Sequence, residues 1–157
     1  LIARVNNLLN TKSNLQKYFY NEITLQENSQ KVSAEDKAFL DQCMAIIEDH
    51  IDDDQFEIKV LADKMCMSHS SLYKKIHYST GYSVTGFIRF VRLRKAAEIF
   101  VNTRSNVNET AFMVGFSDVK YFRSQFQKLF EMTPSAYIKK FRKPFEKSFS
   151  RKNQMGE

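Results

Sequence analysis

The fold of this chain is decided by the stretch GFSDVKYFRSQFQKLF, residues 115–130 of 157. It follows ETAFMV, residues 109–114, whose apolar residues have helical spacing. Gly115 stands between the two segments, and a glycine can take the positive φ that lets two helices meet at a sharp angle. In the second segment apolar residues recur at intervals of four and three, at Phe122, Phe126 and Leu129. The stretch therefore predicts a helix-turn-helix whose second helix packs on one side and is free on the other.

An earlier part of the chain, residues 61–77, repeats this design. Ala62 lies four residues before Cys66, just as Ala111 lies four residues before Gly115. A small alanine at this position lets the second helix of a unit approach the first closely. The two copies are offset by 49 residues at the alanine and by 50 residues at the first core residue of the second helix.

Serine residues stand where each second helix is expected to begin. Ser68 and Ser117 each follow the alanine of their unit by six residues. A serine hydroxyl at such a place can accept a hydrogen bond from a free backbone N–H group of the first helical turn. We therefore expect two helix-turn-helix units, at about residues 56–80 and 107–131.

The part of the chain before the first unit has three segments. Residues 1–9 have the apolar spacing of an amphipathic helix. Residues 10–34 are polar, a composition typical of a linker. Ser33 is placed to cap a further helix that runs to about His50.

After the second unit, Thr133-Pro134 predicts the start of a short last helix, because threonine caps well and proline suits the first helical position. Its Tyr137 is expected to join Phe122, Phe126 and Phe130 in an aromatic core. Residues 144–157 are polar and basic, and we expect a flexible tail there. The chain is thus predicted to be all-α, with an N-terminal helical arm.

Charge is distributed unevenly along the chain. Residues 1–54 contain 5 Lys/Arg and 10 Asp/Glu, whereas residues 55–157 contain 19 and 8, so their net charges are −5 and +11. Such asymmetry indicates a polyanionic partner, and with DNA it would give an affinity that falls steeply with salt.

No signal peptide and no apolar run long enough to cross a bilayer is found, so this segment is expected to make no membrane contact.

A long helix is predicted between the two units, over residues 83–100 with Ser83 as its cap. Eighteen residues at 1.5 Å each span roughly 27 Å, close to one turn of DNA at about 34 Å. Such a connector could place the second helices of both units in successive major-groove segments. Its basic residues can contact phosphate or pair with acids such as Glu98, and the pattern leaves both open for Arg89, Arg92, Arg94 and Lys95.

The order and spacing of these residues resemble the AraC/XylS family of bacterial transcription regulators over roughly residues 56–141. The matching positions are Leu61-Ala62, Ser68, Leu72-Tyr73-Lys74, Thr80-Gly81, Arg92-Leu93, Lys95-Ala96, Ala111, Gly115-Phe116, Tyr121-Phe122, Phe126, Phe130, Thr133-Pro134 and Tyr137. Cys66 and Glu131 depart from the family pattern, because they occupy turn positions where glycine is expected. The resemblance implies a DNA-binding domain over residues 35–143, made of two helix-turn-helix units joined by a long helix. It implies double-stranded promoter DNA as the partner and neither a cofactor nor a metal.

The resemblance also places the groove-facing side chains on the second helix of each unit. These are His69, Ser70, Lys74 and His77 in the first unit and Lys120, Arg123, Ser124 and Gln127 in the second. The residue types suit the task, because Arg and Lys donate to guanine, Gln pairs with adenine, and Ser bonds to bases or phosphate. About half of the eight are expected to reach base edges, since most protein–DNA hydrogen bonds avoid the bases. On the connecting helix, Arg89 and Arg92 are the expected phosphate contacts.

Residues 1–9 resemble the last helix of a response-regulator receiver domain, so residues 1–34 are expected to be the end of such a domain and its linker. This resemblance implies the output end of a two-component signalling protein of the response-regulator or hybrid type. Upstream receiver or sensor domains, a homodimer of the full-length protein and contact with RNA polymerase would follow from it. A cytoplasmic location is expected, with any anchor in the inner membrane lying upstream.

Two other functions fit part of the pattern. A helix-turn-helix module can bind protein partners in place of DNA. An enzyme could use Cys43 or Cys66 as a nucleophile, but no His or Asn constellation accompanies either cysteine. The two cysteines are 23 residues apart without clustered histidines, so neither a zinc site nor a disulfide framework is indicated, and a reducing compartment is expected. The pattern favours recognition over catalysis.

Overall fold

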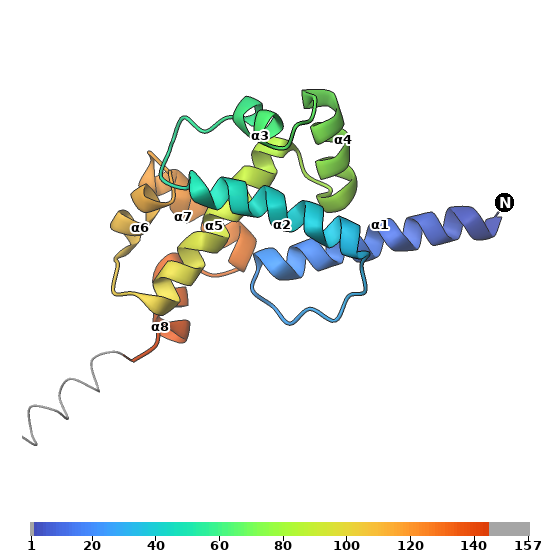
Figure 1. Ribbon diagram of the computed structural model, residues 1–157. Coiled ribbons are helices and arrows are strands. Elements are labelled where there is room, and N and C mark those ends of the chain that lie inside the picture. The colour runs from blue at the N-terminus through green and yellow to red at the C-terminus, as the bar shows by residue number, and fades with distance from the viewer. Residues whose placement is uncertain (1, 145–157) are drawn as a thin grey trace, which may run out of the picture.

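The computed structural model describes residues 2–144, and within that range it contains eight helices and no strand (Figure 1). The helices are α1 (Ile2–Ile23), α2 (Ala34–Asp49), α3 (Ile58–Lys64), α4 (His69–Thr80), α5 (Val84–Asn102), α6 (Val107–Met113), α7 (Val119–Phe130) and α8 (Pro134–Phe141). The prediction of an all-α fold is confirmed. The predicted basic tail lies outside the described residues, apart from its first residue.

Two helix-turn-helix units are present, α3–α4 and α6–α7, as predicted. Their first helices have seven residues each and their second helices twelve. The copies are offset by 49 residues in the first helix and 50 in the second, because the turn of the second unit is one residue longer. Ala62 and Ala111 are fully buried, and their carbonyls accept equivalent turn bonds from the backbone N–H groups of Met67 and Phe116 at 3.0 and 2.9 Å. The units are therefore structural repeats.

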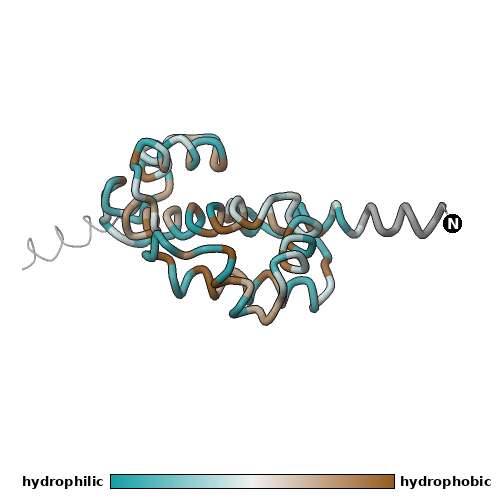
Figure 2. The backbone as a smooth tube through the Cα atoms, turned by 90° about the horizontal axis from the view of Figure 1, so that it is seen from above, coloured by the Kyte–Doolittle hydropathy of each residue, from teal (hydrophilic) through white to brown (hydrophobic). Residues whose placement is uncertain are grey.

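Helix α5 joins the two units and runs through the middle of the molecule (Figure 1). The predicted cap is confirmed, because the hydroxyl of Ser83 accepts a bond from the backbone N–H of Gly86 at 3.1 Å. Its nineteen residues span roughly 28 Å. Helices α1, α2, α4, α6, α7 and α8 all contact it. In Figure 2 brown and teal alternate along the helices, as amphipathic packing around a shared core requires. Helix α5 therefore serves as a common frame for both units.

The predicted aromatic core of the second unit is confirmed. Phe126 is fully buried, with its ring centroid 5.6 Å from that of Phe100, 4.5 Å from that of Phe130 and 5.4 Å from that of Tyr137. Edge-to-face and stacked pairs at such distances are favourable beyond the area that they bury. Helices α5, α7 and α8 thereby hold one another in place.

Helix caps agree with the sequence except at one position. Ser33, Ser68, Ser83 and Thr133 each accept a bond from the first helical turn, as predicted. In the second unit, however, the prediction of Ser117 is wrong. Asp118 is the cap of α7, and its carboxylate accepts a bond from the Tyr121 N–H at 3.2 Å. The extra residue in this turn moves the cap by one position, so that each cap lies four residues before the first core residue of its helix.

The prediction of a linker over residues 10–34 is wrong for its first half. Helix α1 continues to Ile23, and Leu15, Phe19 and Ile23 are buried in the common core. The Phe19 ring stacks on that of Phe87 on α5 at 5.3 Å, and Gln16 Nε2 donates to the Tyr78 carbonyl on α4 at 3.4 Å. Over residues 11–23, where the side chains are described, the buried residues follow one narrow side of α1, so most of the composition is polar. The N-terminal arm is thus packed against α4 and α5.

Positive φ angles confirm that both departures from the family pattern stand at turns. Cys66 has φ 54° in the turn of the first unit, and Gly115 has φ 87° at the equivalent place in the second. Glu131 has φ 60° at the end of α7, and Gly81 has φ 79° at the end of α4. Each left-handed position is therefore a glycine in one unit and another residue in the other.

We expect Cys66→Gly and Glu131→Gly each to raise the free energy of unfolding, by up to about 1 kcal/mol. A left-handed conformation destabilises a residue with a Cβ by roughly 1–2 kcal/mol, and glycine removes this strain. Glycine also has the greater entropy in the unfolded state, which offsets roughly 0.5–1 kcal/mol of the gain. Both side chains are exposed, so little packing is lost. Urea unfolding followed by circular dichroism measures the change. Lys64→Gly, in the last turn of α3, is the control and should be destabilising by about 1 kcal/mol. An equal loss in all three variants would contradict the argument.

Among the helices of residues 2–144, none is both long enough and apolar enough to cross a membrane.

Candidate nucleic-acid interface

The four side chains predicted for the first unit are all exposed on α4. Ser70, Lys74 and His77 lie opposite the buried face that contains Leu72 and Ile76. The cap at Ser68 makes His69 the first residue of α4. The predicted contacts that are exposed on this helix are His69, Ser70, Lys74 and His77. Each of these side chains is free to meet a partner surface.

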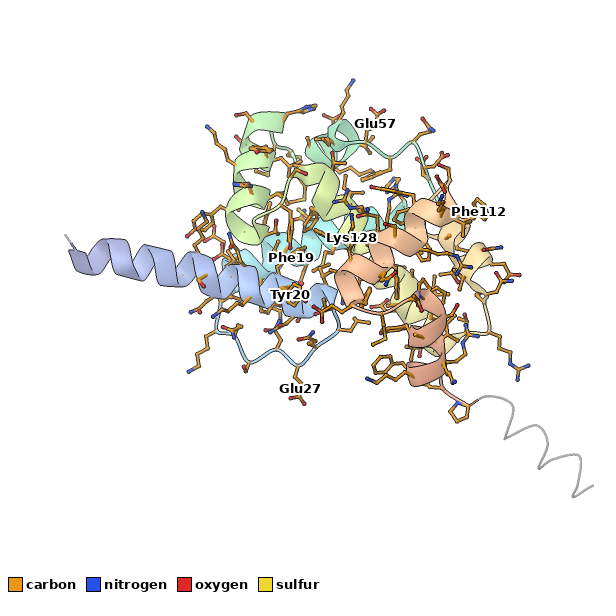
Figure 3. The ribbon with its side chains drawn as sticks, turned by 180° about the vertical axis from the view of Figure 1, so that it is seen from behind. Phe19, Tyr20, Glu27, Glu57, Phe112 and Lys128 are labelled. Atoms are coloured by element: carbon orange, nitrogen blue, oxygen red, sulfur yellow. The ribbon has the colours of Figure 1, made fainter. Side chains whose placement is uncertain are left out.

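The four side chains predicted for the second unit lie on α7 in the same way. Phe122, Phe126 and Leu129 form the buried face of this helix. The exposed set is Lys120, Arg123, Ser124 and Gln127. Both α4 and α7 can be followed on the side of the molecule shown in Figure 3, where Lys128 in the last turn of α7 is labelled. We call α4 and α7 the recognition helices, and contact of the eight side chains with DNA remains a prediction.

Three exposed tyrosines on the recognition helices, Tyr73, Tyr78 and Tyr121, were not among the predicted contacts, and two of them lie directly beside a core residue. The Tyr73 side chain on α4 is 50% exposed, and its ring stacks parallel to that of His77 at 5.7 Å. The Tyr121 side chain on α7 is 44% exposed. Tyrosine belongs to both apolar and polar patterns, so helical periodicity alone did not separate these two from the core. Their sequence positions could have identified them, because Tyr73 and Tyr121 are directly adjacent to the core residues Leu72 and Phe122. Adjacent residues of a helix point in different directions, so a residue next to a core residue can face outward.

A cleft of about 600 Å³ lies between the two units. His69 at the start of α4 and Tyr121 in the first turn of α7 both line it. Arg89 and Ile88 of α5 also belong to its lining. The cleft therefore connects the N-terminal ends of both recognition helices across the connecting helix.

Arg89 lines this cleft and contacts side chains of α7 and α5. Its Nη1 donates to the Tyr121 hydroxyl oxygen at 3.3 Å, and its guanidinium lies 5.4 Å from the centre of the Phe90 ring. The Nε atom is buried and has no hydrogen-bond partner in the part of the chain that the structure describes. The predicted phosphate contact of Arg89 is compatible with this place, because the side chain is only partly buried and faces the cleft.

The predicted phosphate contact of Arg92 is wrong. This side chain is buried, and its guanidinium donates to three backbone carbonyls: Val114 at 3.1 Å, Asp53 at 2.8 Å and Ile51 at 3.5 Å. A phosphate contact needs exposed donors, whereas the guanidinium of Arg92 is buried and directed at these backbone carbonyls. Burial lowers the pKa of Arg92, while the nearby charges of Asp53 and Asp54 act in the opposite direction. Arg92 therefore ties the loop before α3 to the turn before α7.

Gly115 is required beside this arginine. A Cβ atom at this position would overlap Nη1 of Arg92 and would lie 2.7 Å from the Ile51 carbonyl oxygen. Real Cβ atoms do not approach backbone oxygen so closely. The glycine that marks the second turn thus serves two purposes, the left-handed turn and the space for Arg92.

The alternative of intramolecular pairing holds for the two other cations of α5. Arg94 Nε and Lys95 Nζ each lie 3.6 Å from a carboxylate oxygen of Glu98. Ion pairs of this kind at a helix surface contribute little to stability. The four basic side chains of α5 thus have three different roles, which one helical pattern could not distinguish.

The cysteines differ in their surroundings. Cys43 is fully buried on α2, and burial raises the pKa of its thiol to about 12, so that it stays protonated at neutral pH. Cys66 is exposed in the turn of the first unit. Among the described residues there is no group of three or more His, Cys, Asp or Glu side chains arranged to hold a metal ion.

Comparison with known proteins agrees with this architecture. A family model described as "Helix-turn-helix domain" matches residues 61–140. "Histidine kinase P4" of Formosa agariphila is 29% identical over 142 residues, which cover 90% of this chain and 10% of that protein. The chain spans 10–38% of the length of the curated relatives that it matches here.

Two solved structures show the same fold. The C-terminal domain of the two-component response regulator yesN from Fusobacterium nucleatum is 31% identical, with a TM-score of 0.53, over 62% of this chain and 95% of that one. The DNA-binding domain of AdpA, solved in complex with a target DNA, is 23% identical, with a TM-score of 0.55, over 63% of this chain and 88% of that one. With its two helix-turn-helix units, its long connecting helix and the matching family model, the chain belongs to the AraC-type family of helix-turn-helix DNA-binding domains.

Proposed function

We propose that this chain is the sequence-specific DNA-binding output domain of a transcription regulator, and that α4 and α7 enter successive major-groove segments. The observation that carries this proposal is the joint exposure of all eight predicted contact side chains on two helices held by one frame, α5. Recognition helices of helix-turn-helix proteins contact base edges in the major groove in this way. The basic charge of residues 55–157 would supply the salt-dependent part of the affinity.

The regulator is inferred to belong to a two-component system, with receiver or sensor domains upstream. The match to a histidine kinase over 142 residues supports this inference, because it extends well beyond residues 61–140. The packing of α1 on α4 and α5 also supports it, since an upstream domain would then be joined to a recognition helix without a flexible linker. Homodimer formation by the whole protein, contact with RNA polymerase and a cytoplasmic location belong to the same proposal.

Recognition without a catalytic step is the chemistry that we propose for this domain. The buried Cys43 thiol, with its raised pKa, is a poor nucleophile at neutral pH. No cofactor is required for the proposed function. A protein partner in place of DNA is the alternative outcome that the binding experiment distinguishes.

The test is fluorescence-anisotropy binding to a duplex selected in vitro from a random pool and to a scrambled duplex, between roughly 50 and 200 mM salt. We expect the selected duplex to be preferred by a factor of about 10³ or more, which is roughly 4 kcal/mol. Equal, salt-sensitive binding to both duplexes would contradict sequence-specific recognition. Absence of binding to either would favour the protein-interaction alternative.

Arg123→Ala is expected to weaken binding to the selected duplex by about 1–3 kcal/mol and to relax the preference at one base pair. The reason is that an exposed arginine on α7 can donate two bonds to one guanine. Lys139→Ala, which removes an exposed cation of α8, is the matched control and should change both affinities by the same small factor. A uniform loss in Arg123→Ala would instead indicate a phosphate contact.

A further inference from the structure

We propose that the cleft between the recognition helices binds a backbone phosphate of the DNA between the two major-groove segments, and that Arg89 and Tyr121 bind it as a pair. This inference rests on the proposed function. It adds Tyr121, which was not among the predicted contacts, and a defined place on the DNA. It also separates Arg89 from Arg92, whose buried guanidinium donates to the Val114 and Asp53 carbonyls.

The position of the cleft carries the first step. His69, the first residue of α4, lies on one side of it, and Tyr121, the third residue of α7, lies on the other. The N-terminal residues of recognition helices are those that contact base edges. When both ends lie in successive major-groove segments, the minor groove and its two sugar–phosphate strands lie between them. These strands must then pass across the mouth of the cleft.

The donors inside the cleft carry the second step. Arg89 Nη1 donates to the Tyr121 hydroxyl oxygen at 3.3 Å, so the hydroxyl proton is free to be donated to another acceptor. A hydroxyl that accepts a bond from a cation is also a stronger donor. A guanidinium has five N–H donors in a planar fork, a geometry that matches phosphate oxygens. The pair is therefore oriented before DNA binds, which lowers the entropic cost of the contact.

The charges around the cleft limit what it can bind. Three carboxylates, those of Asp54, Glu57 and Asp118, also belong to its lining. The Asp118 carboxylate already accepts a bond from the Tyr121 N–H at 3.2 Å. Because acids offset the cations, the cleft is not a general basic patch that attracts any anion. It would hold one phosphate through directed hydrogen bonds, at a place set by the two recognition helices.

The experiment combines two protein variants with chemically altered DNA. The probe is the selected duplex, on which footprinting first locates the two segments that the protein protects. Each phosphate between these segments is then replaced, one at a time, by an uncharged methylphosphonate. Tyr121→Phe removes only the hydroxyl, and Arg89→Met removes only the guanidinium. Tyr73→Phe is the matched control, because Tyr73 is an exposed tyrosine of the other recognition helix and does not line the cleft. Thermal unfolding by circular dichroism checks that each variant is folded.

We expect each cleft variant to lose about tenfold in affinity, on the selected and scrambled duplexes alike, because a phosphate contact does not depend on base sequence. Arg89→Met should also lower the salt slope by about 0.9. The wild-type chain should lose about tenfold when one particular spacer phosphate is neutralised, and the variants should lose nothing further on that duplex. Tyr73→Phe should keep the full wild-type response to the methylphosphonate.

The proposal would be overturned if the variants were as sensitive to every spacer methylphosphonate as the wild type is. The loss in affinity from the variant and the loss from the altered DNA would then be independent, and the two factors would multiply. A wild-type chain that binds the selected duplex but tolerates methylphosphonate at every spacer position would also overturn the proposal. Failure of the proposed function has a different signature, namely equal wild-type affinity for the selected and scrambled duplexes. The salt slopes of Arg89→Met and the wild type on scrambled DNA would still test the phosphate contact in that case.

Discussion

Replacement of Arg92 by methionine is expected to lower the free energy of unfolding by about 3 kcal/mol, although no ligand contact is lost. Its guanidinium makes two short charge-assisted bonds, to the Asp53 carbonyl at 2.8 Å and to the Val114 carbonyl at 3.1 Å. Hydrogen bonds of a charged group contribute roughly 1.5–3 kcal/mol each. Methionine retains the apolar stem, so the loss reports the bonds rather than the packing. Urea unfolding followed by circular dichroism measures it.

Lys95→Met is the control for this prediction. Lys95 lies on the same helix and forms an ion pair with Glu98, and its side chain is 36% exposed. Loss of this exposed ion pair should lower the free energy of unfolding by less than about 1 kcal/mol. Equal stabilities of the two variants would contradict the assignment of Arg92 as a tie between the units. We also expect Arg92→Met to bind the selected duplex more weakly than Lys95→Met does, because the turn before α7 loses its connection to the loop before α3.

Replacement of Phe126 by alanine is expected to lower the free energy of unfolding by about 3–5 kcal/mol. Phe126 is fully buried at the centre of the aromatic cluster, within 6 Å of the ring centroids of Phe100, Phe122, Phe130 and Tyr137. Its removal leaves a cavity bordered by three helices that cannot all move inward. The change is measured by urea or thermal unfolding, and DNA affinity should fall in parallel since α7 loses its support.

Phe112→Ala is the matched control for the aromatic core. The Phe112 side chain on α6, which is labelled in Figure 3, lies at the surface. Its exposed fraction is 56%, and a surface substitution of this kind usually changes stability by less than about 0.5 kcal/mol. A loss of less than about 1.5 kcal/mol in Phe126→Ala would show that the cluster closes around the cavity. The rigid support for α7 argued above would then be incorrect.

The amino-acid sequence determined the features that depend on neighbouring residues. The connecting helix and the caps at Ser33, Ser68 and Ser83 follow from spacing within a few turns of one helix, and the repeat offset follows from the recurrence of one local pattern. The aromatic stripe of α7 follows from the same periodicity, because residues three and four apart share one face of a helix. For the same reason seven of the eight predicted contact side chains lie on exposed helix faces, whereas His69 is exposed as the first residue of α4.

Only the tertiary structure decided the features that depend on residues far apart in the chain. Arg92 has the same local setting as Arg89 and Arg94, yet it is buried because carbonyls from residues 51, 53 and 114 converge on it. Helix α1 has a polar composition, but α4 and α5 cover one narrow side of it and so make that side part of the core. The cap moved from Ser117 to Asp118 because the longer second turn had to place Phe122 in the core. In all three cases, burial is determined by which distant groups meet, and spacing along one helix contains no information about that.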